Sequence, residues 1–122
     1  MLKTVLRASA VLFVALTAGV AAFAQGGPSG DAARGKQLYT TIGCSYCHGT
    51  VGQGGGGRTG GLRLANMGIA FPAFINQLRQ PQDEMPPYVA SALPDKDVAD
   101  IFAYVSSLPP PPDAKSIPLL NP

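Results

Sequence analysis

The sequence has 122 residues, with nine Lys and Arg against seven Asp and Glu and a formal net charge of +2. This length is enough for one small domain. The basic residues form no lysine-rich patch and no stripe interleaved with aromatic residues, so the composition gives no reason to expect nucleic-acid binding.

Residues 1–24 are predicted to be a signal peptide. Lys3 and Arg7 form a basic start, an apolar run covers residues 8–20, and Ala22-Phe23-Ala24 has the small residues that a signal peptidase recognises. Because a membrane-spanning helix needs roughly 20 apolar residues, this run is short for an anchor. We therefore expect cleavage after Ala24 and export of the protein, with retention as an uncleaved anchor as the alternative.

After the signal peptide, residues 25–30 contain Gly, Ser and Pro and are expected to be a flexible leader. Residues 31–108 are predicted to be the folded domain. Its first helix is expected to begin near Asp31, with Ser29 or Asp31 as the N-cap, and to end at Gly43. Residues 52–61 are rich in glycine and are predicted to be a loop.

Two further helices follow from the spacing of apolar residues. One is predicted over residues 72–79, since apolar side chains recur at i, i+3, i+4 and i+7 and Pro81 ends the pattern. The other is predicted over residues 94–108, with an apolar stripe formed by Val98, Ile101, Phe102, Val105 and Leu108. The tail, residues 109–122, is Pro-rich and expected to be extended. No alternating strand pattern is present, so the sequence predicts an all-α fold with long loops.

The segment Cys44-Ser45-Tyr46-Cys47-His48 carries the candidate site. Its C-x-x-C-H pattern is the attachment signature for haem c. Two thiols at this spacing can each add to one haem vinyl group, and the imidazole of the next residue can bind the iron. A disulfide, a thioredoxin-like redox pair and a zinc site are the alternatives. The glycines after the motif argue against the redox pair, and the zinc site lacks a fourth ligand.

The numbers of histidines and methionines in the chain limit the candidates for the axial ligands of the iron. His48 is the only histidine, which predicts a single haem and excludes ligation by two histidines. The candidates for the sixth ligand are the two methionines of the mature chain, Met67 and Met85. Pro86 and Pro87 follow Met85 and hold the chain extended, which favours Met85 as the ligand. Met67 has no such support and is expected to be mainly a core residue.

The C-x-x-C-H motif, the downstream Met85-Pro86-Pro87-Tyr88 and a closing helix with Ala103-Tyr104-Val105 together resemble a small bacterial class I cytochrome c. The resemblance covers residues 31 to about 108. It implies a small helical domain around one covalently bound haem c. The residues that the resemblance assigns to haem binding are two thioether anchors, a proximal ligand and a distal ligand: Cys44, Cys47, His48 and Met85.

The resemblance also implies how the helices pack. In such cytochromes the N-terminal helix crosses the C-terminal helix near the haem edge. Gly35 and Tyr39 would then lie at the crossing, opposite Ile101 and Tyr104. A glycine at this point would allow close approach of the two helices, although it costs about 1 kcal/mol in helix propensity. The chain departs from larger members of the family in its short segment between histidine and methionine and in the glycine-rich loop, residues 52–61.

The function implied by the resemblance is that of a periplasmic one-electron carrier rather than an enzyme, either free or as the haem subunit of a periplasmic dehydrogenase. Its partners would be redox proteins, with a dehydrogenase as donor and an oxidase or another cytochrome as acceptor, and peripheral association with a membrane complex is allowed. The alternative is a haem-based ligand-binding or sensor protein whose sixth ligand is weak or absent. Arg63 and Arg79 are candidates for pairing with the haem propionates or for solvated surface positions.

Overall fold

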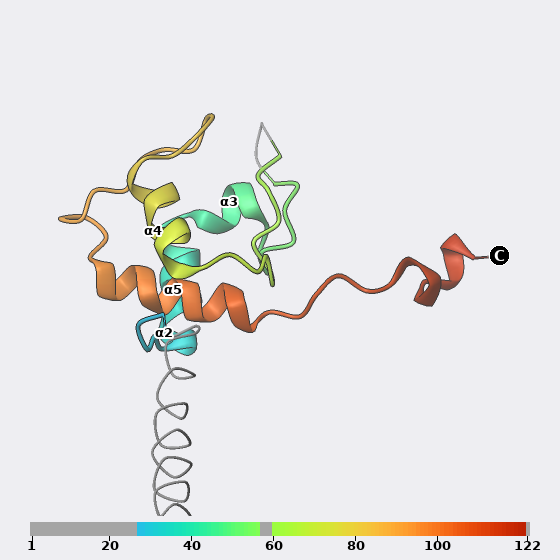
Figure 1. Cartoon of the computed structure of the whole chain (residues 1–122). Helices are drawn as coiled ribbons and strands as arrows, with labels where there is room; N and C mark the ends of the chain where they lie inside the picture. The colour runs from blue at the N-terminus through green and yellow to red at the C-terminus, as the bar shows by residue number, and fades with distance from the viewer. Residues whose placement is uncertain (1–26, 57–59, 122) are drawn as a thin grey trace, which may run out of the picture.

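The computed structural model describes residues 27–56 and 60–121. The α-helices within these ranges are α2 (Ala32–Thr41), α3 (Cys44–His48), α4 (Phe71–Arg79) and α5 (Asp95–Ser107) (Figure 1). Two short 3-10 helices, η1 (Ala114–Ser116) and η2 (Pro118–Leu120), follow in the tail. No strand occurs within these two described ranges, and the prediction of an all-α fold is confirmed.

The predicted signal peptide, residues 1–24, and the first two residues of the leader lie outside the described part of the chain. Among the helices of the described residues, none has the length and apolar content needed to cross a membrane. Cleavage after Ala24 therefore stays a prediction.

Helix α2 begins where the sequence predicts it. The backbone of Asp31 is extended, and its Oδ1 accepts hydrogen bonds from the backbone N–H groups of Ala33 (2.9 Å) and Arg34 (3.1 Å). Of the two candidate caps, Asp31 is therefore the one used, since its carboxylate binds N–H groups that have no partner inside the helix. The helix ends before Gly43, whose φ of 95° lies in the left-handed region that favours glycine.

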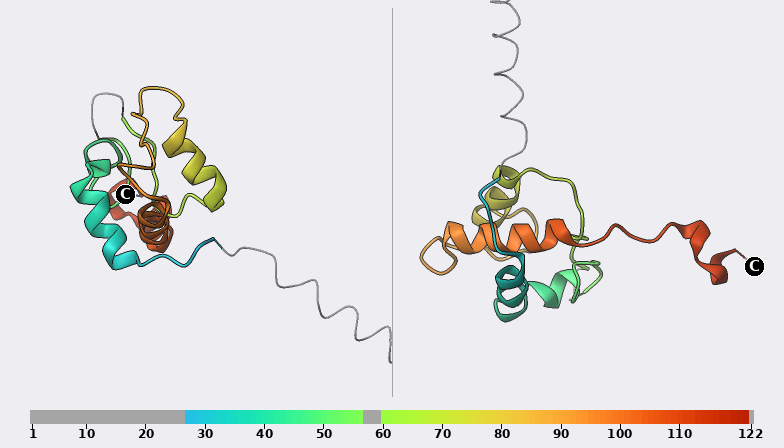
Figure 2. Two further views of the ribbon diagram at one scale, coloured as in Figure 1. Left: turned by 90° about the vertical axis from the view of Figure 1, so that its left-hand side faces the viewer. Right: turned by 90° about the horizontal axis from the view of Figure 1, so that it is seen from below.

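Helices α2 and α5 cross each other at the centre of the fold (Figure 2). Gly35 is buried at the crossing, where an added Cβ atom would overlap the backbone carbonyl of Asp100 and lie 3.0 Å from the backbone nitrogen of Ile101. One turn further along α2, the buried ring of Tyr39 packs edge-on against Tyr104, with ring centroids 5.4 Å apart. The prediction that Gly35 permits close approach of the two helices is confirmed.

A buried carboxylate joins the start of α2 to the middle of α5. Asp100 is 0% exposed, and its Oδ1 accepts a hydrogen bond from the backbone N–H of Asp31 at 2.7 Å. Its Oδ2 accepts hydrogen bonds from Arg34 and, at 3.1 Å, from Lys96. The Asp31 N–H first, and then the Arg34 guanidinium, lower the pKa of Asp100 to about 2. Arg34 also donates to Asp97 at 2.6 Å, and the two carboxylates raise the pKa of Arg34.

This pKa predicts how stability depends on pH. Asp100 keeps its charge in the folded protein down to about pH 2, whereas its ordinary pKa is 3.8, so the unfolded chain binds the proton first as the pH falls. The stabilisation by the carboxylate is therefore complete above pH 3.8 and is lost as the pH falls towards 2. We expect Asp100→Asn to lower the melting temperature at neutral pH. The difference in melting temperature between the variant and the unsubstituted protein should shrink as the pH falls from 3.8 towards 2.

Thermal unfolding followed by circular dichroism at a series of pH values measures this difference. Asp113→Asn is the matched control, because Asp113 lies in the tail and its carboxylate caps only η1. It should leave the melting temperature unchanged at every pH. An Asp100→Asn difference that stays undiminished at pH 2 would contradict the assignment of the stabilisation to the ionised carboxylate.

Helix α4 packs against α5 through aromatic side chains. Phe102 of α5 contacts Phe71 and Phe74 of α4, with ring centroids 5.4 Å and 5.3 Å apart. The helix begins at Phe71, one residue earlier than predicted. Pro72 is accommodated because it stands in the first turn, where its missing N–H removes no internal hydrogen bond. The apolar spacing places Leu78 in the core, one turn after Phe74.

The core lies where α2, α4 and α5 meet. Its buried members are Tyr39, Phe74, Leu78, Leu93, Val98, Ile101, Tyr104 and Val105. The predicted stripe of α5 supplies three of these, while Phe102 and Leu108 are half-buried beside them. The view along α5 in Figure 2 shows α2 and α3 on one side of this helix and α4 on the other. The C-x-x-C-H helix and the loop after α4 are therefore both supported by the same core.

The tail differs from the extended segment that was predicted. Residues 109–112 carry no helix, but η1 and η2 form two turns beyond them. The side chain of Asp113 accepts a hydrogen bond from the backbone N–H of Lys115 (3.0 Å), and Asn121 Nδ2 donates to the carbonyl of Ala114 (2.7 Å). Asp and Asn side chains favour turns through such local hydrogen bonds, which explains the difference. Figure 1 shows this segment directed away from the helical domain.

Candidate functional site

The five residues of the C-x-x-C-H motif form one short helix, α3. Gly43 precedes it with a φ of 95°, and Gly49 follows it with a φ of 80°. Each end of the helix is therefore flanked by a glycine with a positive φ, which other residues rarely adopt. Cys44 and Cys47 are three positions apart and lie on the same side of the helix. This helix was not predicted from the sequence, because five residues are too few to show a periodic pattern.

Both cysteines of the motif are free thiols in this structure. Cys44 is half-buried against the core, and burial raises the pKa of its thiol. Cys47 is exposed. The helix ends at His48, one residue after the second cysteine, whereas the C-x-x-C of a thioredoxin-like redox pair opens a longer helix. The arrangement leaves two sulfur atoms on one side of α3 for bond formation with a ligand.

The imidazole of His48 has a defined orientation. Its Nδ1 lies 2.7 Å from the backbone carbonyl oxygen of Leu62. A carbonyl oxygen only accepts hydrogen bonds, so Nδ1 carries the proton and donates it to Leu62. The lone pair is then on Nε2, which is the nitrogen available to a metal. Metal-bound histidines are generally held in this way by a partner of the other ring nitrogen.

The glycine-rich loop gives α3 its C-terminal hydrogen-bond partners. The backbone N–H of Gly54 donates to the carbonyl of His48 at 2.7 Å, and that of Gly56 donates to the carbonyl of Cys47 at 3.0 Å. A Cβ atom added to Gly56 would lie 2.6 Å from the carbonyl oxygen of Tyr46. The loop therefore needs glycine to pass this close to the helix, and it satisfies carbonyl groups that α3 leaves without partners.

Tyr39 connects the core to the same end of α3. Its hydroxyl is buried and donates a hydrogen bond of 2.6 Å to the carbonyl of Gly49. Burial raises the pKa of Tyr39 to about 12, so the hydroxyl keeps its proton at neutral pH and remains a donor. Since Gly49 directly follows His48, this bond helps to fix the end of the helix that carries the imidazole.

Met85 lies in the segment that connects α4 with α5. Residues 85–89 have no regular secondary structure, which agrees with the prediction that Pro86 and Pro87 prevent a helix there. Met85 is half-buried and packs against the core cluster. Gln77 of α4 approaches its sulfur, with 4.0 Å between Nε2 and Sδ. The thioether is thus held at the edge of the core and is not enclosed by it.

Met67 does not occupy the core position that was expected for it. Its side chain is 37% exposed. The neighbours on both sides, Asn66 and Gly68, have φ values of 52° and 69°, and this left-handed turn directs the segment away from the core. The expectation of a core role for Met67 is therefore wrong.

The surface beside the motif fits a large apolar cofactor. Leu62, which holds the imidazole of His48 through its carbonyl, has a side chain that is 77% exposed. Leu64, Ile69 and Met85 are only partly buried against the core cluster. A covalently held haem would cover apolar side chains of this kind, and the two free thiols and the imidazole nitrogen are the groups that would hold it. The donor set and its surroundings therefore fit haem c.

A family model described as "Cytochrome C oxidase, cbb3-type, subunit III" matches residues 30–105, which include α2, α3, α4 and most of α5. The chain belongs to this family of class I c-type cytochromes. A cytochrome c domain carries covalently bound haem c and works in electron transfer rather than catalysis, so the resemblance and the class of cofactor predicted from the motif are confirmed. Comparison with the curated proteins and with the solved structures found no match.

Tyr88 follows Met85 and the two prolines in the segment between α4 and α5 of this cytochrome c domain. Burial raises the pKa of the Tyr88 hydroxyl, and the nearby charges of Cys44 and Cys47 raise it further. Tyr88 is also packed against the core cluster, as are Cys44 and Met85. Cys44 of α3 and Met85 of this segment thus pack against the same core from two separate elements.

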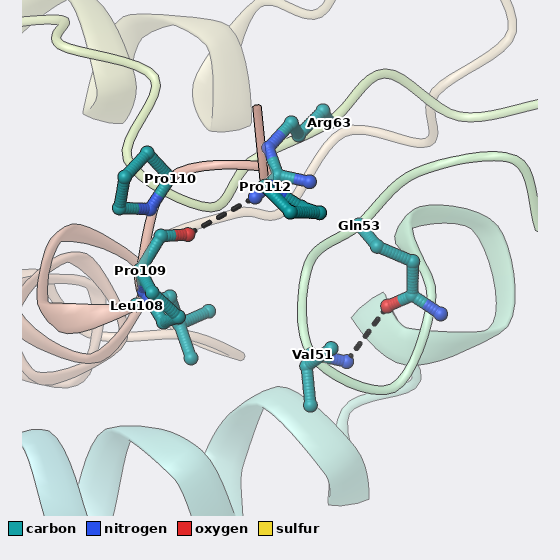
Figure 3. A pocket seen from close by; sticks show the side chains of 7 residues that line it. All are labelled: Val51, Gln53, Arg63, Leu108, Pro109, Pro110 and Pro112. Carbon is teal, nitrogen blue, oxygen red and sulfur yellow. Dashed lines mark hydrogen bonds between the residues drawn. The ribbon is translucent and has the colours of Figure 1, made fainter. Parts of the chain in front are cut away.

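Arg63 has hydrogen-bond partners within the chain of the cytochrome, which differs from a solvated surface position, and its pairing with a haem propionate stays a prediction. Its Nε donates to the carbonyl of Ala65 at 3.2 Å, and its Nη2 donates to the carbonyl of Pro109 at 3.0 Å. It therefore joins the segment after Leu62 to the point where the tail leaves α5. A hollow of about 340 Å³ lies beside this bridge, and its lining side chains are drawn in Figure 3. The hollow is lined by Val51, Gln53, Arg63, Leu108, Pro109, Pro110 and Pro112.

Arg79 likewise binds groups of the cytochrome's own chain. Its Nη1 donates to the carbonyl of Tyr88 at 2.6 Å. Its Nη2 donates to the carbonyl of Leu93 at 2.8 Å and to Asp95 Oδ1 at 2.5 Å. The guanidinium is therefore bound by the loop that follows α4 and by the start of α5, which differs from a solvated surface position. Its pairing with a haem propionate stays a prediction.

Proposed function

We propose that the protein is exported to the periplasm, carries one haem c bonded to Cys44 and Cys47, and transfers single electrons between redox proteins. It acts either as a free carrier or as the haem subunit of a periplasmic dehydrogenase. The observation that carries the proposal is the hydrogen bond between Nδ1 of His48 and the Leu62 carbonyl, at 2.7 Å. This bond prepares Nε2 for iron beside two free thiols.

Four residues of the chain hold the haem in this proposal. Cys44 and Cys47 supply the sulfur atoms for the thioether bonds, His48 supplies Nε2 as the proximal ligand, and Met85 supplies its thioether as the distal ligand. When bound, the haem supplies reversible one-electron chemistry. A methionine sulfur and an apolar surround both favour the reduced iron, so this ligand pair supports a higher reduction potential than two histidines would. With both axial positions taken, no position is left for a substrate.

The proposed partners follow from this chemistry. The electron donor is a periplasmic dehydrogenase, and the acceptor is an oxidase or another cytochrome, which permits peripheral association with a membrane complex. Membership of a cytochrome c family supports redox proteins as partners. Export is supported by the basic start, the apolar run and the Ala22-Phe23-Ala24 sequence at the N-terminus.

Removal of the distal thioether tests the proposal. We expect Met85→Ala to abolish the sulfur-to-ferric-iron charge-transfer band and to lower the reduction potential on the order of 100 mV, because axial ligands set the potential over roughly 0.8 V. The reduced variant should also bind carbon monoxide quickly, since one axial position becomes free. Visible spectroscopy, redox titration and stopped-flow mixing with carbon monoxide measure these three effects.

Met67→Ala is the matched control, because Met67 is the other methionine of the folded domain and its side chain is exposed. It should change neither the band nor the potential. If the unsubstituted reduced protein binds carbon monoxide quickly and fully at neutral pH, the carrier proposal with Met85 ligation is wrong. That result would instead support a haem-based ligand-binding or sensor protein.

A further inference from the structure

The Arg79 side chain closes the base of the loop that carries Met85. Arg79 is the last residue of α4, and its side chain is 20% exposed. Through its three hydrogen bonds, it contacts the chain at Tyr88, at Leu93 and at Asp95. Hydrogen bonds from a charged donor are stronger than those between neutral groups. One side chain thus holds α4, the following loop and the first residue of α5 together.

Tyr88 is fixed to α4 through both of its backbone groups. Its N–H donates to the carbonyl of Leu78 at 2.8 Å, while its own carbonyl accepts the bond from Arg79 at 2.6 Å. The chain therefore leaves α4 after Arg79 and returns to the same end of the helix at Tyr88. Fixing both ends of a loop removes much of its conformational freedom.

Apart from the packing of Met85 against the core cluster, the loop has few stabilising contacts of its own. Within residues 27–56 and 60–121, the one hydrogen bond made by residues 81–87 is a long contact from Gln77 Nε2 to Met85 Sδ at 4.0 Å. Pro86 and Pro87 stand between Met85 and the fixed Tyr88, and their rings restrict φ. The position of the thioether therefore depends on the base of the loop, through a short and stiff stretch of chain.

We propose that Arg79 is a positioning residue that holds the loop of residues 80–88 so that the Met85 thioether stays on the haem iron. The inference rests on the proposed function, since it takes Met85 as the distal ligand. It assigns Arg79 to the stability of the iron–sulfur bond, and not to binding of a haem propionate. Without the clamp, the loop can swing away from the iron while the helical core remains folded.

The test compares the haem-loaded protein with its Arg79→Gln and Arg79→Lys variants. The rate of carbon monoxide binding to the reduced protein reports how often the thioether leaves the iron. We expect it to rise about tenfold in Arg79→Gln, because hydrogen bonds to a charged group are lost, and to rise less in Arg79→Lys, which keeps one charged donor. On heating, the sulfur-to-iron charge-transfer band of Arg79→Gln should disappear well before the helical circular dichroism does.

Arg63→Gln is the matched control, because Arg63 also bridges two backbone carbonyls, those of Ala65 and Pro109, at a different place in the domain. It should leave the carbon monoxide rate unchanged. In one outcome, Arg79→Gln loses the charge-transfer band and the helical circular dichroism at the same, lower temperature, and the rate of carbon monoxide binding is unchanged. Arg79 is then only a general stabiliser, and the proposal is wrong. If Arg79→Gln does not fold, the Arg79→Lys measurements decide in the same way.

Amide hydrogen exchange separates this proposal from the assignment of Met85. The Tyr88 amide donates to Leu78, and its exchange should be faster in Arg79→Gln while the amides in the middle of α5 keep their rates. Equal acceleration in both places would overturn the clamp. A third outcome is faster exchange of the Tyr88 amide in Arg79→Gln together with no charge-transfer band in the unsubstituted protein. Arg79 then does hold the loop, but Met85 is not the iron ligand, and the proposed role of Arg79 in the iron–sulfur bond is overturned.

Discussion

Replacement of both Cys44 and Cys47 by alanine is expected to abolish covalent haem attachment. On a denaturing gel only a covalent bond keeps haem with the chain, and a thioether bond requires a cysteine sulfur. The double variant, matured in a host with the haem-attachment machinery, should therefore give no haem-stained band and an intact mass equal to that of the polypeptide. The folded fraction should also fall, because haem would cover the apolar surface beside the motif, including Leu62, which is 77% exposed.

The single variants refine this expectation. Each keeps one thiol and should keep some stained protein with the added mass of a haem. Cys44 packs against the core, whereas Cys47 is exposed, so Cys44→Ala should lower the free energy of unfolding by about 1 kcal/mol more than Cys47→Ala does. Ser45→Ala is the control, because Ser45 lies between the two cysteines and leaves both in place. A haem stain that persists in the double variant would contradict the assignment of the attachment sites.

Gly35→Ala is expected to destabilise the protein strongly although alanine is the better helix former. An added Cβ atom would overlap the backbone carbonyl of Asp100, and a backbone carbonyl inside a helix cannot turn aside as a flexible side chain can. The helices must then move apart, which disturbs the contact between Tyr39 and Tyr104. We expect a loss of about 3 kcal/mol in the free energy of unfolding, against a gain of about 1 kcal/mol from helix propensity alone.

Thermal or denaturant unfolding of the haem-loaded protein measures this loss, which corresponds to a fall of roughly 15 °C in melting temperature for a domain of this size. Gly60→Ala is the control. An added Cβ atom at Gly60 meets nothing within 4 Å. The only cost of alanine there is the left-handed backbone, with a φ of 64°, which alanine adopts less readily than glycine. That variant should lose about 1 kcal/mol. A higher melting temperature in Gly35→Ala would show that α2 and α5 do not approach so closely.

Several elements of the fold could be predicted because their causes are local. The cap by Asp31 depends on a side chain and the two N–H groups that follow it closely in the chain. The apolar stripe of α5 repeats with the period of a helix, so its buried face is visible in the sequence. The prediction for Gly35 came from the resemblance to class I cytochromes c, and the close approach to Asp100 explains the glycine physically.

Other features were missed or misjudged because no local signal specifies them. Helix α3 has five residues and is held by the glycine loop and by the Tyr39 hydroxyl, so its own sequence shows no helical period. Met67 was assigned to the core from its chemistry, but the left-handed turn of its neighbours places it outside. Arg79 offers the same donors to a propionate and to a backbone carbonyl, and only the path of the chain selects between them.

The sequence by itself determined the chemistry of this protein: two thiols and one imidazole at the spacing for haem c, and a methionine braced by two prolines. These candidate haem-binding groups are visible in the sequence because residue type fixes their chemistry and covalent geometry limits the distance between residues close in the chain. Only the tertiary structure decided that the His48 imidazole donates to Leu62, 14 residues away, and that Arg79 binds Tyr88, nine residues away. Such bonds depend on where packing of the core brings distant backbone groups, and residue spacing alone does not encode that distance.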